Sequence, residues 1–190
     1  PAEFQEAAVK AHDPLVVMVA EGNDALMEQF FDKGTIPVED LVPGLRQAMG
    51  ERRLHPVVVA AGLPNIGSNA LLDFIVDYLP SPVERGEVEG LDQEGGKPLK
   101  RPVADDQPVS AYVFKTVADP FAGRVSYFRV MSGVLKNEDH LTNFNRGTSE
   151  RLSHIGIVQG KTQTAIAELR AGDIGAVAKL KETLTGDTLG

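Results

Sequence analysis

The chain contains no cysteine and no tryptophan among its 190 residues. The lack of cysteine excludes a disulfide framework and every metal site built on thiolates. Its longest apolar run, residues 15–20, is far shorter than the ~20 residues that a membrane-spanning helix needs. Residues 1–10 hold no basic segment followed by an apolar one, so the sequence shows no secretory signal. With 42% apolar residues, the chain can still build a core.

The net charge of -8 is divided unevenly along the chain. Residues 1–100 hold eight Lys or Arg and 17 Asp or Glu, whereas residues 101–190 hold 11 and 10. The acidic first part would repel nucleic-acid phosphates, while the nearly neutral second part permits a local basic patch. The simpler alternative is that these charges cover the solvated surfaces of two different domains.

The first eighty residues predict helices with one buried strand. Residues 24–31 and 38–53 carry apolar side chains at helical spacing. Residues 56–61 form a continuous apolar run with three valines, which is typical of a strand covered on both faces. Ser68 is a candidate N-cap for a helix that Pro80 ends. Strand, loop and helix in this order are typical of a βα unit in a nucleotide-binding α/β domain.

The second half predicts a linker followed by many short strands. From residue 83 to 108 the composition changes to Glu, Gly, Asp, Lys and Pro, which indicates a linker or an extended surface loop. Short alternating segments follow, each bounded by Gly, Asp, Asn or Pro. They are residues 109–117, 123–131, 140–144, 149–158, 165–169 and 174–180. Their spacing predicts an antiparallel barrel or sandwich.

No catalytic or metal site is predicted from the motifs. Residues 156–162, GIVQGKT, resemble a phosphate loop but place three residues between the glycines where that loop needs four. The segment also lies among predicted strands, so we interpret Gly160 and Lys161 as a turn. The four histidines show no metal-ligand spacing, and no Ser-His-Asp or Cys-His combination has a nucleophile context.

Basic and aromatic residues alternate in the strand-rich half. The set comprises Arg124, Tyr127, Phe128, Arg129, Phe144, Arg146 and Arg151. Basic and aromatic side chains on adjacent strands are one way in which a β-barrel binds RNA. The alternative is that the aromatic residues form the core and the arginines only its solvated margin.

Four segments together resemble elongation factor G. Residues 119–133 read DPFAGRVSYFRVMSG, residues 79–82 read LPSP, residues 170–174 read RAGDI, and residues 185–189 read TGDTL. These segments agree with that family in order and spacing. The chain is therefore similar to the end of the GTPase domain of this family followed by its complete second domain.

The resemblance implies a multidomain α/β plus all-β fold. Residues 1–82 would be a mainly helical remnant of a P-loop GTPase domain, including its last βα unit. Residues 83–103 would be the linker. Residues 104–190 would form the antiparallel translation-factor β-barrel, called domain II.

The resemblance also implies where nucleotide and RNA contacts would lie. Ala61, Gly62 and Leu63 correspond to the loop whose backbone contacts the guanine base. The family usually has Ser-Ala-Leu or Ser-Ala-Lys there, so this departure suggests a divergent elongation factor G-like paralogue. In the barrel, Arg124, Arg146 and Arg151 are the expected RNA contacts, with Lys136 a weaker candidate.

On this resemblance, the chain is a fragment of a ribosome-associated translational GTPase whose barrel couples nucleotide state to ribosome binding. Its partners would be small-subunit ribosomal RNA and the GTPase domain and switch regions of the same parent protein, in a cytoplasmic monomer without a membrane partner. GTP would be the cofactor of the parent. The chain itself lacks the phosphate loop, the switches and the Asn-Lys-x-Asp motif, so we expect no cofactor and no hydrolysis here. The alternative is a stand-alone β-barrel interaction module that binds RNA or protein without nucleotide.

Overall fold

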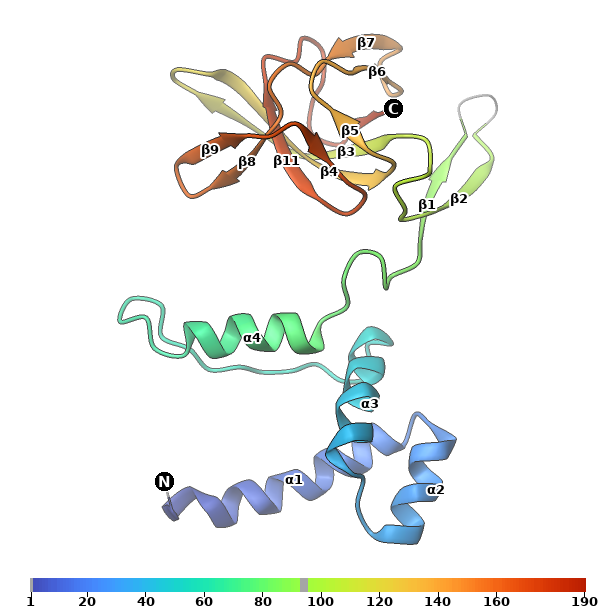
Figure 1. The fold of residues 1–190 in the computed structure, drawn as a ribbon, viewed down its shortest axis with the longest axis vertical. Helices are drawn as coiled ribbons and strands as arrows, with labels where there is room; N and C mark the ends of the chain where they lie inside the picture. Colours follow the sequence, from blue (N-terminus) through green and yellow to red (C-terminus); the bar gives the residue numbers. More distant parts are fainter. Residues whose placement is uncertain (1, 93–95) are drawn as a thin grey trace. The chain divides into compact units, whose positions relative to one another are not determined.

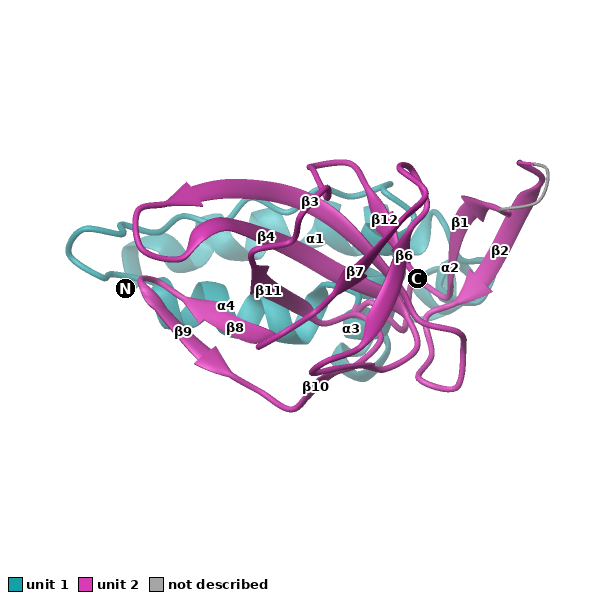
Figure 2. Ribbon diagram, turned by 90° about the horizontal axis from the view of Figure 1, so that it is seen from above, with its two compact units in different colours: residues 1–80 teal, residues 81–190 magenta. Residues whose placement is uncertain are grey.

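The structure is a computed structural model that describes residues 2–92 and 96–190. It divides into two compact units, residues 1–80 and residues 81–190 (Figure 2). Each unit is described by itself.

The first unit is helical (Figure 1). It consists of a short 3-10 helix η1 (Ala2–Phe4), α1 (Gln5–Ala20), α2 (Asp24–Lys33), α3 (Val38–Gly50) and α4 (Ser68–Tyr78). Its small core is formed by Val16, Ala20 and Ile36, against which partly buried side chains of α2 and α3 pack. The predicted helices over residues 24–31 and 38–53 are therefore present, with slightly different ends.

Local chemistry explains where two of these helices begin and end. Asn23 caps α2, because its Oδ1 accepts hydrogen bonds from the N–H groups of Ala25 at 3.1 Å and Leu26 at 3.2 Å. Gly34 ends α2 with φ at 71°, in the left-handed region that favours glycine. The predicted cap Ser68 is instead the first residue of α4 and makes no capping hydrogen bond.

The predicted buried strand over residues 56–61 is wrong. This segment has no regular strand structure, and the side chains of Val57 and Val59 are 91% and 90% exposed. A strand of a parallel sheet exists only when neighbouring strands accept its hydrogen bonds and helices cover its faces. Within residues 2–80 the structure describes no strand that could be this neighbour. Only an isolated bridge between Ala61 and Ile66 forms.

The second unit is built from strands. They are β1 (Glu87–Leu91), β2 (Pro98–Pro102), β3 (Ser110–Asp119), β4 (Gly123–Ser132), β5 (Leu135–Lys136), β6 (His140–Asn143), β7 (Thr148–Arg151), β8 (Gly156–Gln159), β9 (Thr162–Ala165), β10 (Glu168–Leu169), β11 (Ile174–Ala178) and β12 (Thr188–Leu189). Eight of them form one antiparallel sheet in the order β7-β6-β12-β3-β4-β11-β8-β9. β5 pairs with β10.

The barrel core lies between the curved strands (Figure 2). Alternation along β4 places Phe128 and Val130 inside, each without exposed surface, while Tyr127 and Arg129 point outward and are partly exposed. The core comprises Ala111, Val113, Phe128, Val130, Leu135, Leu141, Leu152, Ile155, Leu169, Val177, Leu180 and Leu189. The helical first part and the antiparallel barrel confirm the predicted fold class.

The predicted linker contains a β-hairpin. β1 and β2 pair over their full length within residues 83–103. No alternating apolar pattern marks these strands in the sequence, because the hairpin is largely exposed on both faces. The two-residue strands β5 and β12 also escaped prediction, since so short a strand carries no recognisable period.

Candidate functional site

A network of buried polar groups holds the last loop of the barrel against the β6–β7 hairpin. Asp187 is 5% exposed. Its Oδ2 accepts hydrogen bonds from Asn143 Nδ2 at 2.9 Å, Arg146 Nε at 2.7 Å and Leu184 N at 2.9 Å. Asn143 also donates to Thr183 Oγ1 at 3.1 Å. Five residues from two distant segments are thereby connected.

Glu150 of β7 belongs to the same network, because it accepts a hydrogen bond from Thr183. It is 2% exposed. Its carboxylate accepts from the N–H groups of Lys181, Glu182 and Thr183 at 3.0, 2.8 and 3.0 Å, and from Thr183 Oγ1 at 2.9 Å. Four donors from one short loop offset the cost of burying this charge.

Both buried carboxylates favour their charged form. Burial by itself would raise the pKa of Asp187, but the hydrogen bonds from Asn143, Leu184 and Arg146 outweigh it and lower the pKa below its ordinary value. Burial likewise acts to raise the pKa of Glu150, and the donors of the loop after β11 more than reverse this. The network is therefore fully formed at neutral pH.

Three of the predicted RNA contacts lie along the β6–β7 hairpin and beside it. Arg146 follows β6 in the hairpin turn, with its side chain 37% exposed beside Asp187. Arg151 ends β7, is 62% exposed and forms an ion pair with Glu138. Lys136 of β5 is exposed and has no ion-pair partner within the described residues. Lys136 and Arg151 thus lie near one end of the hairpin, since Glu138, two positions after Lys136 in the chain, pairs with Arg151, and Arg146 lies at the other end.

Arg124 is turned toward the barrel. Its terminal nitrogen donates to the carbonyl oxygens of Leu180 at 2.8 Å and Lys181 at 2.5 Å, and its Nε is buried without a hydrogen-bond partner within the described residues. This guanidinium is committed to the loop that Glu150 also holds. We therefore assign Arg124 a structural role.

The aromatic residues divide between core and surface. Phe128 is fully buried, whereas Phe144 is 40% exposed and Tyr127 partly exposed. Phe128 thus belongs to the core, whereas Tyr127 and Phe144 reach the surface.

The predicted guanine loop forms a tight exposed turn in the first unit. Ala61 and Ile66 exchange two backbone hydrogen bonds at 2.9 and 3.0 Å, and Leu63 has no contact that covers it, with 102% relative exposure. The N–H of Ala61 is therefore already used within the turn. The N–H groups of Gly62 and Leu63 donate no backbone hydrogen bond to the described residues.

The segment that resembles a phosphate loop is a hairpin turn, as predicted. β8 and β9 pair up to Gln159 and Thr162, and Gly160 between them has φ at 59°.

Across residues 2–92 and 96–190, no group of three or more His, Asp or Glu side chains has the arrangement of a metal site. Over the same residues, no helix has the length and apolar character needed to cross a bilayer.

The β3–β4 hairpin ends in an exposed turn that the side chain of Asp119 caps. Asp119 Oδ1 accepts from the N–H groups of Phe121 at 2.8 Å and Ala122 at 2.7 Å, which lowers the pKa of this carboxyl. Gly123 completes the turn with φ at 77°. Phe121 at the tip is 97% exposed. Asp119 and Pro120 thus begin the turn that connects β3 with β4.

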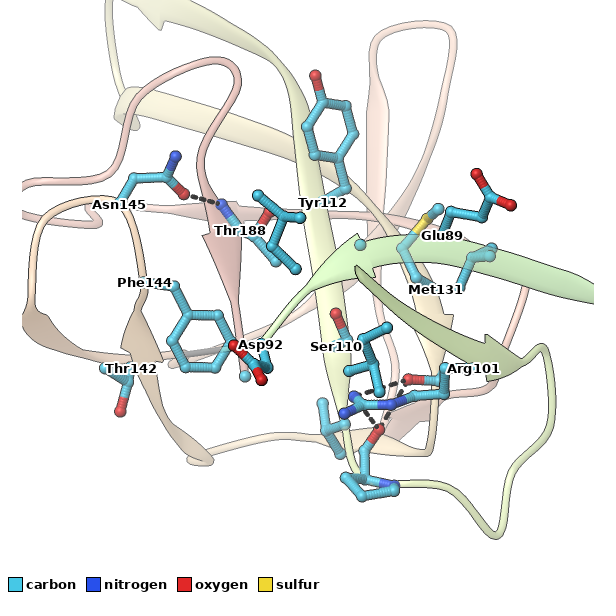
Figure 3. Close-up of a pocket in the computed structure, with 18 of the residues that line it drawn as sticks. Glu89, Asp92, Arg101, Ser110, Tyr112, Met131, Thr142, Phe144, Asn145 and Thr188 are labelled. Atoms are coloured by element: carbon cyan, nitrogen blue, oxygen red, sulfur yellow. Dashed lines mark hydrogen bonds between the residues drawn. The ribbon is translucent and has the colours of Figure 1, made fainter. Parts of the chain in front are cut away.

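A groove of about 1110 Å³ runs between the β1–β2 hairpin and the outer face of β3, β6 and β12. Figure 3 shows Tyr112, Phe144, Thr142 and Thr188 along the barrel side and Arg101 on the hairpin side. Tyr112 and Phe144 are 42% and 40% exposed, so aromatic surface faces the groove. Sequence reasoning missed this feature because it depends on the unpredicted hairpin.

Comparison with known proteins agrees with this architecture. Residues 108–190 match the family described as elongation factor G domain 2. A crystal structure of a protein from Thermus thermophilus is similar to the whole chain, with 30% sequence identity and a TM-score of 0.78. The match covers 100% of this chain and 26% of that one, so the chain spans about a quarter of the length of this relative.

The barrel described above occupies the matched residues, from β3 to β12. Residues 108–190 thus match elongation factor G domain 2, a translation-factor domain, and the chain as a whole is elongation factor G-like.

Proposed function

We propose that this chain is part of a ribosome-associated translational GTPase, in which the barrel couples the nucleotide state to ribosome binding. The match of the barrel to elongation factor G domain 2 carries the proposal. Lys136, Arg146 and Arg151 are its proposed contacts with small-subunit ribosomal RNA.

The geometry of Arg146 supports a phosphate contact. Its Nε is hydrogen-bonded to Asp187, and its backbone N–H donates to Asn143 Oδ1 at 3.1 Å. These bonds fix the base of the side chain, so less conformational entropy is lost on binding. Its terminal nitrogens have no hydrogen-bond partner within the described residues and are donors for a phosphate oxygen.

Lys136 and Arg151 provide charge at the other end of the hairpin. The ion pair of Arg151 with Glu138 is exposed, and an exposed pair contributes little, so a phosphate can compete for the guanidinium. Few cations take part, so we expect weak binding with a shallow salt dependence. These phosphate contacts would position the barrel on the RNA without reading its base sequence.

In this proposal GTP belongs to the parent protein. The loop of Ala61, Gly62 and Leu63 would contact guanine there, and the phosphate groups would be held by segments that this sequence does not contain. The chain alone performs no hydrolysis in this account.

Steady-state GTP hydrolysis by the full-length parent with purified ribosomes tests the proposal. Replacing Lys136 and Arg151 by alanine should reduce the ribosome-stimulated rate and leave nucleotide affinity unchanged, because neither side chain holds a buried group. Arg170→Ala is the matched control, since Arg170 is also 62% exposed and paired with carboxylates.

The effect should shrink as salt rises, because fewer counterions are released when a phosphate contact is lost. Equal stimulation of the double variant and wild type at two salt concentrations would remove this edge from the ribosome contact. It would then favour the alternative of a barrel that acts as an interaction module without nucleotide.

A further inference from the structure

The pairing of β1 with β2 fixes which backbone groups of the hairpin point outward. Asp92 N–H donates to Lys97 O at 2.9 Å, and Val103 N–H donates to Gly86 O at 2.9 Å, beyond either end of the paired strands. Hydrogen-bonded and non-hydrogen-bonded pairs alternate in an antiparallel ladder. Val88 and Gly90 of β1 therefore bond to β2. Glu87, Glu89 and Leu91 direct their N–H and C=O groups to the free edge.

The free edge of β2 is blunted. Its outward-directed residues are those paired with Glu87, Glu89 and Leu91, and two of these three are Pro98 and Pro102. Proline has no N–H to offer to an added strand, and it is a common means of blocking an edge.

The free edge of β1 is open. Glu89 and Leu91 direct both N–H and C=O groups away from β2, and Leu91 is 70% exposed. Neither residue makes a further backbone hydrogen bond within the described part of the chain. β1 thus presents two adjacent sites at which an extended chain could form a ladder.

This open edge faces the groove. Residues 88–92 line it consecutively, whereas β2 contributes only the alternate residues Leu99 and Arg101. Successive residues of a strand point to opposite faces, so a wall made of consecutive residues presents the edge of β1. β2 presents one face. The opposite wall carries the half-exposed rings of Tyr112 and Phe144.

We propose that the groove binds an extended segment of a partner protein, which adds to the edge of β1 as a third strand. Residues of the segment that face the barrel would be apolar, because Tyr112 and Met131 line that side and the cation Arg101 would repel a basic residue. Residues on the other face would be basic, opposite the carboxylate of Glu89, because its ion pair with Lys100 at 3.2 Å is exposed and contributes little. Backbone bonds would give affinity, and this alternation would give specificity.

Charge also argues against a second copy of this chain as the occupant. An antiparallel pair of two β1 edges would bring Glu87 and Glu89 of one copy against the same residues of the other. Like charges directly opposite each other destabilise a pair of strands. The docking of a basic and apolar segment does not depend on the ribosome contact proposed above, because none of Lys136, Arg146 and Arg151 lines the groove.

The acetylated and amidated peptide TVKVKVT serves as the probe in an NMR titration of the isotope-labelled chain. We expect saturable shifts at the amides of Glu89 and Leu91. The peptides TVEVEVT, with reversed charge, and TVKPKVT, which lacks the central N–H, should bind at least about tenfold more weakly.

Leu91→Pro separates edge pairing from simple contact. It removes an outward N–H but no bond to β2, since Leu91 and Pro98 form a non-hydrogen-bonded pair of the ladder. This variant should weaken binding of TVKVKVT at least about tenfold, whereas Leu91→Ala, which keeps the N–H, should stay within about threefold of wild type. Absence of saturable shifts up to about 1 mM peptide, equal affinity for Leu91→Pro and wild type, or shifts confined to another edge such as β9 would each overturn the proposal. Self-association of the chain through β1, seen as concentration-dependent shifts without peptide, would overturn it as well.

Discussion

Arg146 donates its Nε hydrogen to Asp187 at 2.7 Å, although the two residues lie 41 positions apart. Asp187 is almost fully buried, whereas Arg146 reaches the surface. One side chain therefore connects the internal polar network with the proposed RNA contact. We expect changes at Asp187 to affect both stability and the orientation of Arg146.

Asp187→Asn should destabilise the barrel by about 1–3 kcal/mol, because the amide cannot replace both the charge and the three accepted hydrogen bonds. Urea unfolding of the whole chain, followed by a probe of the second unit, measures this. Arg151→Ala removes an exposed ion pair and should change stability by less than about 1 kcal/mol. An equal loss of unfolding free energy in both variants would show that the buried network contributes no more to stability than an exposed ion pair.

Stability should fall in acid because of Asp187 and Glu150. Each has a folded-state pKa below its ordinary value of about 4, so its contribution is complete above that value and is lost as pH falls through the folded-state pKa. We expect a plateau from neutral pH to about pH 5 and a steep loss below about pH 4.

Thermal unfolding between pH 7 and pH 3 tests this direction, and Glu150→Gln should flatten the acid limb while lowering stability at pH 7. A wild-type stability that rises on acidification would contradict the assigned shifts.

Gly123→Ala should destabilise the β3–β4 hairpin by about 1 kcal/mol, because an L residue with a side chain is strained at φ of 77° even though open space surrounds this site. Gly90→Ala in β1 is the matched control, since its Cβ also meets nothing within 4 Å and its φ is not positive. In circular dichroism melts, Gly123→Ala should lower the midpoint of unfolding more than Gly90→Ala does. If Gly90→Ala were the more damaging change, backbone strain would not be the cause.

The chain alone should bind neither GTP nor GDP. Only the loop of Ala61, Gly62 and Leu63 remains of the expected site, and contacts with the base without contacts to the phosphates lose most of the affinity. Isothermal titration calorimetry with both nucleotides measures this. Saturable micromolar binding would point to a phosphate site that the present account lacks.

The sequence predicted those parts of the molecule that local pattern determines. The strands around Phe128, the turn at Asp119 and the turn at Gly160 follow from alternation and turn chemistry, and the structure has them. The strand predicted over the valines at 57–59 is wrong, because an apolar run forms a strand only when a sheet surrounds it. The network around Asp187 has no local signal in the sequence, because the partners of this side chain come from distant segments.

Directed hydroxyl-radical probing tests the ribosome contact most directly. The chain has no cysteine, so Lys136→Cys introduces a single attachment point for an iron chelate, and Gln163→Cys on β9 is a control on another strand (Figure 1). With purified small subunits, the chelate at position 136 should cleave ribosomal RNA at a few defined sites, and cleavage should weaken with salt and when Arg151 is replaced by alanine. The chelate at position 163 should give little cleavage. No cleavage from position 136, or an identical pattern from both positions, would contradict the proposal that this edge of the barrel faces the ribosome.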